Sequence, residues 1–276
     1  MKTLLYIFLG LSLMFGCSDD SDSDSNESDT VDPVNECTVS STFSSVTIGD
    51  QIWTNSNLDI STYCDGTLIP QFIGNNTDNQ EWRNLTTGAW TYTQNCDCGA
   101  GYNFSEAELH SFGKLYNWYA VAGIHDNDDL TPNKKFAPDN WRVPTYNDYQ
   151  VLFDNNSITS LRASGTVENG DGLWFSGMGS FQEGTNETGF SAIPAGARNP
   201  NGSGNNNGGY ANLGYYTYYW TSNSGDGIEN AWLVIMSSQA SPYDYEINHG
   251  GNEEYNWTSD YSRRNAFSVR LVKDLE

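Results

Sequence analysis

The sequence predicts an α+β domain of short strands, two helices and long loops. Only 17% of its 276 residues are charged, 14% are aromatic and 27 are glycine, a profile that suits aromatic-packed strands better than a helical bundle. Strand-like runs separated by Gly and Asn clusters dominate from residue 165 onward. Two segments carry helix-capping signals. The length allows one large domain or two small ones.

The first elements expected are a hairpin and a long helix. Val46, Ile48 and Ile52 alternate with polar residues, and Gly49-Asp50 marks the turn between two strands. Farther on, Ser105 is a helix cap with Glu108 at the third helical position. The apolar stripe that follows consists of Leu109, Phe112, Tyr116 and Tyr119. We therefore expect one helix over residues 106–122, ending near Gly123.

The run "NWRVPTYNDYQVL" (residues 140–152) predicts the second helix. Pro144 fixes its own φ, and Thr145 caps the helix with Asp148 as the capping-box acid. Trp141 is expected to be a buried anchor and Arg142 a locally paired or rim residue. Helix entry explains the run, which is therefore interpreted as a marker of the fold that does not carry the chemistry.

The charge balance excludes one class of partner. The chain holds 12 basic and 35 acidic residues, a net charge of −23. Nucleic acid would be repelled, because its binding depends on Lys and Arg neutralising phosphates. Without the eight acids of residues 19–36 and without Lys2, 27 acids and 11 bases remain, about −16.

The N-terminus resembles that of a bacterial lipoprotein. Lys2 precedes an apolar run, Leu4–Phe15, that is too short for a stable membrane anchor, and Gly16-Cys17 follows it. The resemblance implies a signal peptide over residues 1–16, lipidation of Cys17 and an anchor in a membrane. Residues 17–36 are an acidic, solvated tether whose Ser-Asp-Asp start resembles surface-export signals of Bacteroidota lipoproteins. A single folded domain is expected over residues 37–276.

Four further cysteines indicate disulfides. An even number in an exported chain favours two bonds among Cys37, Cys64, Cys96 and Cys98. Because Cys96 and Cys98 are so close in sequence, we expect Cys37 and Cys64 each to pair with one of them, in either order. A zinc site at Cys-x-Cys is less favoured, because no histidine lies nearby.

Several stretches, in this order, resemble one family. They include "IGDQIWTNSNL", "WRNLTTGAW", "GKLYNWYAV", "FAPDNWRVPTYNDYQVL", "ETGFSAIPAGAR" and "AFSVRLVKD". Together they resemble the Fibrobacter succinogenes major paralogous domain, from about Val46 to Asp274. Two positions depart from the family pattern, since Asn140 replaces the usual Gly and Leu271 replaces a cysteine. Trp-Arg-x-Pro-Thr and the closing strand are also similar to formylglycine-generating-enzyme-like members of the C-type lectin-like folds. This resemblance implies two helices flanking irregular antiparallel sheets, with the chain ends close together.

No catalytic pattern is present in the sequence. The enzymes of that fold use a cysteine pair late in the chain, and here no cysteine follows Cys98. The three histidines form no His-Glu-x-x-His pattern, and no Gly-x-Ser-x-Gly elbow occurs. We therefore expect a non-enzymatic protein without a cofactor. For calcium, Asp244, Glu246, Glu253 and Glu254 are weak candidate ligands in an acidic loop that is more simply solvated.

Aromatic residues are the main functional signal. In "YYTYYWTSN", at least half of the aromatic side chains should face the core, because strand residues alternate in direction. A later loop offers a candidate ligand-binding surface made of Tyr243, Tyr245, Tyr255, Trp257, Tyr261, Arg263 and Arg264. The expected function is a surface-exposed outer-membrane lipoprotein that binds a glycan or a protein. The alternative is an accessory subunit of an outer-membrane protein complex.

Overall fold

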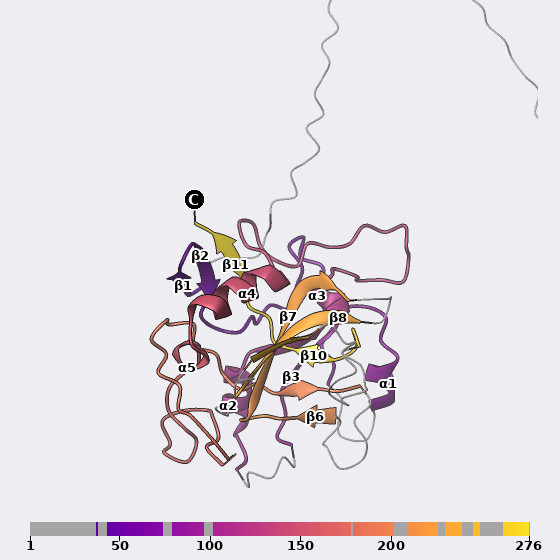
Figure 1. Cartoon of the computed structure of the whole chain (residues 1–276). Helices are drawn as coiled ribbons and strands as arrows, with labels where there is room; N and C mark the ends of the chain where they lie inside the picture. Colours follow the sequence, from indigo (N-terminus) through magenta and orange to yellow (C-terminus); the bar gives the residue numbers. More distant parts are fainter. Residues whose placement is uncertain are drawn as a thin grey trace, which may run out of the picture. The chain divides into compact units, whose positions relative to one another are not determined.

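The computed structural model describes residues 37, 43–73, 79–96, 102–177, 179–200, 209–225, 230–238, 245–248 and 262–275, with backbone only at 79 and 245–248. Three antiparallel sheets carry most of the regular structure in these ranges (Figure 1). They lie within Asn35–Glu276, one compact unit of the chain.

The first sheet joins the beginning and the end of the folded part. Strands β1 (Ser45–Ile48) and β2 (Gln51–Thr54) form the expected hairpin, and Gly49 at its turn has a φ of 60°. The other edge of β2 pairs antiparallel with β11 (Val272–Asp274). The ends of the domain therefore lie side by side, as expected, and the three labels stand together in Figure 1.

The second sheet is assembled from distant parts of the sequence. Its order is β3 (Trp90–Tyr92), β4 (Lys114–Asn117), β10 (Ala266–Phe267), β5 (Ala197–Arg198) and β6 (Tyr210–Ala211), and all neighbours are antiparallel. Most of these strands are only two or three residues long, so side-chain packing must hold them in place.

The third sheet is a meander of consecutive strands. It contains β7 (Tyr216–Ser224), β8 (Ala231–Ser237) and β9 (Tyr245–Asn248). On β7, Tyr219 and Trp220 are fully buried, whereas Tyr216 and Tyr218 are half-buried. Tyr218 and Tyr215 also pack against clusters of buried core residues, so the expectation that at least half of the aromatic side chains in this run face the core is confirmed.

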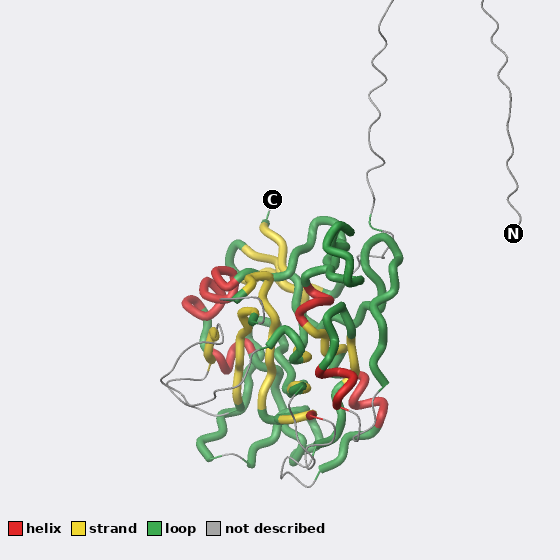
Figure 2. Tube along the Cα trace, turned by 90° about the vertical axis from the view of Figure 1, so that its right-hand side faces the viewer, coloured by secondary structure: helices red, strands yellow, loops and turns green. Residues whose placement is uncertain are grey.

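Five short helices surround the strands in the described ranges, and long loops connect them (Figure 2). They are α1 (Asn79–Arg83), α2 (Glu106–Ser111), α3 (Trp118–Val121), α4 (Tyr146–Asn155) and α5 (Ile158–Leu161). Both expected capping boxes are present, at the start of α2 and of α4. None of the helices described is both long and apolar enough to cross a membrane.

The single helix expected over residues 106–122 is wrong. Helix α2 stops at Ser111, and Gly113 has a φ of 74°, which a helix cannot continue. A side chain at Gly113 would also lie 2.9 Å from Cβ of Asn57, so the chain needs glycine here. The next residues form β4, and Asn117 then caps the separate helix α3. The apolar stripe therefore runs through buried residues of α2, β4 and α3. Every residue of β4 is buried, so Tyr116 falls into the helical spacing although it lies on a strand.

The core contains a buried arginine that ties the first and last segments together. The guanidinium of Arg270 donates hydrogen bonds to the carbonyl oxygens of Thr54, Phe190 and Ser191 at 2.8–3.0 Å, and to Oδ1 of Asn57 at 2.8 Å. These four acceptors satisfy a charge that would otherwise be costly to bury. The fold is thus α+β, with several antiparallel sheets and short helices.

Candidate functional site

Most of the candidate surface between Tyr243 and Arg264 lies outside the described residues. Tyr243, Tyr255, Trp257 and Tyr261 are all in ranges that the structure does not describe. Tyr245 begins β9, of which only the backbone is described. Arg263 and Arg264 are the two members whose side chains can be placed.

Both arginines take part in packing contacts. The guanidinium of Arg263 lies over the ring of Trp118 at 4.5 Å from its centroid, and its Nε donates to the carbonyl of Asn230 at 3.3 Å. Nε of Arg264 donates to the carbonyl of Leu85 at 3.1 Å, and the carbonyl of Arg264 accepts from the indole of Trp82. Arg264 therefore joins the segment before β10 to the region of α1, whereas Arg263 stacks on Trp118, which lines a groove described below.

The candidate metal ligands are not brought together in the part of the chain that the structure describes. Asp244, Glu253 and Glu254 fall outside it, and only the backbone of Glu246, in β9, falls within it. Among described residues, no group of three His, Cys, Asp or Glu side chains is arranged to hold a metal ion. In a second acidic loop, at residues 126–129, the carboxylates of Asp126 and Asp128 accept hydrogen bonds from backbone N–H groups of the loop itself.

A groove of about 350 Å³ opens beside the Trp-Arg-x-Pro-Thr run. Its apolar lining comes from α3 and its C-cap (Trp118, Val121, Ala122) and from the segment before α4 (Phe136, Ala137, Trp141, Val143). Lys135, Arg142, Thr145 and Ser222 complete it. We call this the tryptophan groove. Its volume is at the lower end of the range of about 300–1,000 Å³ that is usual for ligand sites.

Backbone hydrogen bonds hold the walls of the groove together. The carbonyl of Pro144 accepts from the N–H of Ser222 at 2.8 Å, which joins the start of α4 to the end of β7. The backbone N–H of Trp118 donates to the carbonyl of Arg263 at 2.8 Å, and its indole donates to Thr221 at 3.2 Å. The groove is therefore a fixed feature of the packed domain.

Trp141 is less buried than expected. It is half-buried, with the ring of Phe43 edge-on at 5.8 Å and the ammonium group of Lys273 above it at 5.1 Å. Asn140 just before it has a φ of 65°, in the left-handed region that favours glycine and tolerates asparagine. This backbone conformation explains why Asn can replace the Gly that family members usually carry here.

Arg142 is paired, as expected, and its partners rigidify the groove. Its guanidinium donates to Oδ1 of Asp148 at 2.8 Å and to Oδ1 of Asp274 at 2.9 Å. Burial alone would raise the pKa of Asp148, but the hydrogen bonds from Arg142 and Thr145 outweigh it, so the pKa is lowered. Arg142 thus connects the first turn of α4 to β11.

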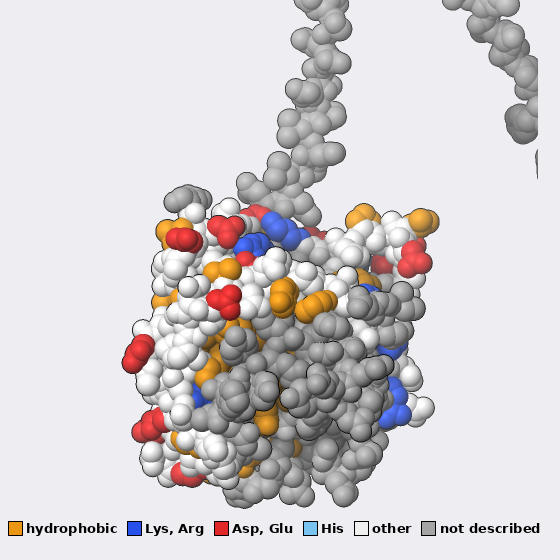
Figure 3. Space-filling model, viewed as in Figure 1, with side chains coloured by type: hydrophobic (Ala, Val, Ile, Leu, Met, Phe, Trp, Pro, Cys, Tyr) orange, Lys and Arg blue, Asp and Glu red, His pale blue; other side chains and the backbone are white. Residues whose placement is uncertain are grey.

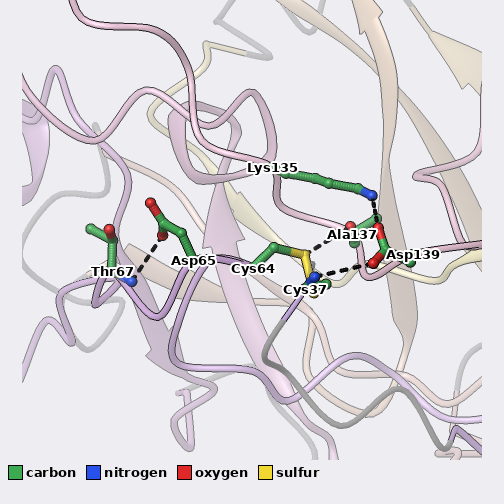
Figure 4. Close-up of a disulfide and its surroundings, with 7 residues drawn as sticks. All are labelled: Cys37, Cys64, Asp65, Thr67, Lys135, Ala137 and Asp139. Carbon is green, nitrogen blue, oxygen red and sulfur yellow. Dashed lines mark hydrogen bonds and ion pairs between the residues drawn. A yellow bond between two sulfur atoms is a disulfide. The ribbon is translucent and has the colours of Figure 1, made fainter. Parts of the chain in front are cut away.

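A disulfide supports the opposite wall. Cys37 is bonded to Cys64, so the expectation that each would pair with Cys96 or Cys98 is wrong. The segment Lys135–Asp139 holds the two cysteines together. The N–H of Cys64 donates to the carbonyl of Lys135 at 2.9 Å. The N–H of Cys37 donates to Asp139 at 3.1 Å, as Figure 4 shows. Cys96 also takes part in a disulfide. The positions of the cysteines in the sequence could not reveal this pairing, because the two cysteines are held together by a loop that is distant in the sequence.

Comparison with known proteins identifies the domain. The family model of the Fibrobacter succinogenes major domain matches residues 46–273. The chain belongs to this family. No curated protein matches the chain, and no solved structure matches it either.

All residues that line the groove lie inside the span of the Fibrobacter succinogenes major domain, whereas Cys37 precedes it. The groove itself was missed by sequence reasoning. Trp141 and Arg142, which line the groove, could have indicated it, but the start of a helix was a sufficient explanation for residues 140–152. Three separated segments create the cavity, and only the folded chain shows that they meet.

Proposed function

We propose that this protein is a non-enzymatic binding module and that the tryptophan groove holds its ligand, a glycan or a protein. The observation that carries the proposal is an open, mostly apolar groove with a few polar groups at its rim. This is the usual composition of ligand-binding pockets. Hydrophobic side chains are exposed on the same face, between α4 and α3, with basic side chains above them (Figure 3).

The groove lining lacks an arrangement typical of acid–base or nucleophilic catalysis: its amine, on Lys135, is ion-paired with Asp139, and no histidine or carboxylate lines the groove to activate the hydroxyl of Ser222. It contains no histidine, cysteine or carboxylate. The hydroxyl of Thr145 accepts from the N–H of Asp148 as a helix cap, and Arg142 is held in its ion pairs. Proton transfer requires a titratable group within hydrogen-bond reach of the ligand. The lining therefore favours recognition over catalysis.

The proposal places the module on the outer membrane, at the cell surface. Support comes from the short apolar run Leu4–Phe15, from Gly16-Cys17 and from the acidic tether. In this proposal, lipid on Cys17 anchors the chain, and the tether separates the domain from the bilayer. We further propose that the domain is C-type lectin-like. The antiparallel pairing of β2 with β11, together with the two capped helices α2 and α4, supports that assignment.

A groove-filling substitution tests the proposal. Ser222 is exposed on β7 and lines the groove, so Ser222→Tyr should occupy the cavity without burying a polar group. Ser224→Tyr is the matched control, because Ser224 is exposed on the same strand and does not line the groove. Wild type and both variants, as full chains, would be applied to a glycan array and to intact cells.

Loss of binding in Ser222→Tyr, with binding retained in Ser224→Tyr, is the expected result. Equal binding by both variants would show that the binding site is not the tryptophan groove. The next candidate is then the surface between Tyr243 and Arg264, which replacement of Tyr255, Trp257 and Tyr261 by Ala would examine. Co-purification with a membrane complex that survives Ser222→Tyr would favour the accessory-subunit alternative.

A further inference from the structure

Among the residues that the structure describes, two cations and no carboxylate line the tryptophan groove, in contrast to the negative charge of the whole chain. Among described residues, its lining and the groups over its tryptophans supply four cations: Lys135, Arg142, Arg263 and Lys273. The carboxylates paired with them are three: Asp139, Asp148 and Asp274. The whole chain, by comparison, has a net charge of −23.

Two of these cations have no carboxylate partner in the described part of the structure. Arg263 lies over Trp118 and Lys273 over Trp141, and neither forms an ion pair there. Lys135 is paired with Asp139, but its side chain is 51% exposed, so a ligand can reach it. At physiological ionic strength, charges farther away than about 8 Å are largely screened. Among the residues that the structure describes, the charges nearest to a bound ligand therefore sum to a positive value.

The lining favours an apolar side chain over a sugar ring. Seven of the eleven lining residues are apolar, and the hydroxyl of Thr145 is already engaged in the helix cap. A sugar ring carries several hydroxyl groups, each of which loses free energy when it is desolvated without a partner. One large apolar side chain has no polar group to desolvate in such a cavity, and the burial it gains outweighs the side-chain entropy it loses.

We propose that the ligand is an acidic protein segment that inserts one large apolar side chain into the tryptophan groove. Flanking carboxylates of the segment lie against Lys135 on one side and toward Lys273 and Arg263 on the other. This inference rests on the proposed function and specifies its ligand. The apolar anchor supplies affinity, and the cations select the acidic partner.

Three synthetic pentapeptides of one design test this ligand class. The probes are acetyl-Glu-Asp-Phe-Asp-Glu-amide, its Gln/Asn analogue and its all-Lys analogue around the same Phe. Binding to the full chain is followed through the signals of each peptide in nuclear magnetic resonance. We expect the acidic peptide to bind about fivefold more tightly than the neutral one, and the basic one to bind about fivefold more weakly, because an exposed charge contact contributes up to about 1 kcal/mol.

Two pairs of variants locate the contact. Ser222→Tyr should abolish binding and Ser224→Tyr should preserve it. Lys135→Gln should lower the affinity for the acidic peptide about threefold, as expected for the loss of one exposed charge. The control Lys134→Gln removes the neighbouring charge, whose partner is Asp65 and which does not line the groove. It should leave the affinity unchanged.

The outcomes separate the two proposals. If the neutral peptide or a neutral polysaccharide binds as well as the acidic peptide, and Ser222→Tyr abolishes that binding, the groove is a binding site but the acidic ligand class is overturned. Binding of polygalacturonate alone, lost in Ser222→Tyr, overturns the protein partner and retains the groove. If Ser222→Tyr alters the binding of no probe, both proposals are overturned.

Discussion

Asp139 accepts a hydrogen bond from the backbone N–H of Cys37 at 3.1 Å, across 102 residues of sequence. Its other carboxylate oxygen pairs with Lys135, which lines the tryptophan groove. The Lys135 side chain and the Cys37 N–H both lower the pKa of Asp139. The Cys37–Cys64 disulfide and one wall of the groove are therefore a single structural unit.

Removing this disulfide should loosen that wall as well as destabilise the domain. The bond closes a segment of 27 residues, and for such a loop chain entropy predicts a loss of about 3–4 kcal/mol in the free energy of unfolding. The double variant Cys37→Ser, Cys64→Ser would be compared with wild type by urea unfolding and amide hydrogen exchange. The backbone amide at position 64, which donates to the carbonyl of Lys135, should exchange faster in the variant than in wild type. Unchanged exchange there would show that the wall does not depend on the bond.

The second prediction concerns the capping-box carboxylate of α4. Asp148 is buried and accepts hydrogen bonds from Arg142, Gln51 and Thr145. Asp148→Asn should lower the free energy of unfolding by about 2–4 kcal/mol, because it leaves the Arg142 charge with one partner fewer and weakens the helix cap. Asp154→Asn, on the exposed side of the same helix, should change stability by about 0.5 kcal/mol or less.

The pH dependence follows from the lowered pKa of Asp148. A carboxyl group whose pKa is lower in the folded than in the unfolded state stabilises the fold above its unfolded value of about 3.9. That stabilisation is lost as the pH falls through the folded value. Unfolding free energies measured from pH 6 down to about pH 2 should therefore decline less steeply in Asp148→Asn than in wild type. Parallel curves would contradict this assignment.

The third prediction concerns Asn140, whose φ of 65° falls in the left-handed region. Asn140→Ala should destabilise the domain by about 1 kcal/mol, because a Cβ without a polar group is disfavoured there. Asn140→Gly should be neutral within about 0.5 kcal/mol, because glycine adopts this φ freely but loses more entropy on folding. Thermal unfolding of the two variants measures the difference. Equal stability of both would argue against the left-handed conformation.

The fourth prediction concerns the pair Asp65 and Lys134, which supplies the control substitution for the groove. A hydrogen bond from Lys134 at 2.6 Å, followed by one from the N–H of Thr67 at 3.0 Å, lowers the pKa of Asp65 to about 2. In Lys134→Gln the pKa should rise but stay below its ordinary value, because the Thr67 N–H remains. A carboxyl-carbon titration by nuclear magnetic resonance measures it. A pKa that does not move would show that Lys134 is not the main cause.

Local signals in the sequence were sufficient for part of the fold. Ser105 with Glu108 and Thr145 with Asp148 cap helices through contacts within four residues, so the sequence predicts them directly. The Gly49-Asp50 turn is equally local. Each of these features is decided by neighbours along the chain.

Tertiary contacts decided what sequence reasoning missed. An apolar stripe across Gly113 has helical spacing, but the close approach of Asn57 and the pairing of β4 with β3 and β10 break the helix. The disulfide partner of Cys37 depends on the distant loop at Asp139. The groove requires α3, the segment before α4 and Ser222 to meet, and no spacing in the sequence encodes that meeting.

Photo-crosslinking from the groove tests the central claim most directly. The full chain would be produced with the photoreactive residue p-benzoylphenylalanine at Lys135, which lines the groove with an exposed side chain, or, as the control, at Lys134, and irradiated on intact cells. The account predicts a covalent adduct to one defined ligand from position 135 and none from position 134. Adducts from both positions alike, or from neither, would contradict a binding site in the tryptophan groove.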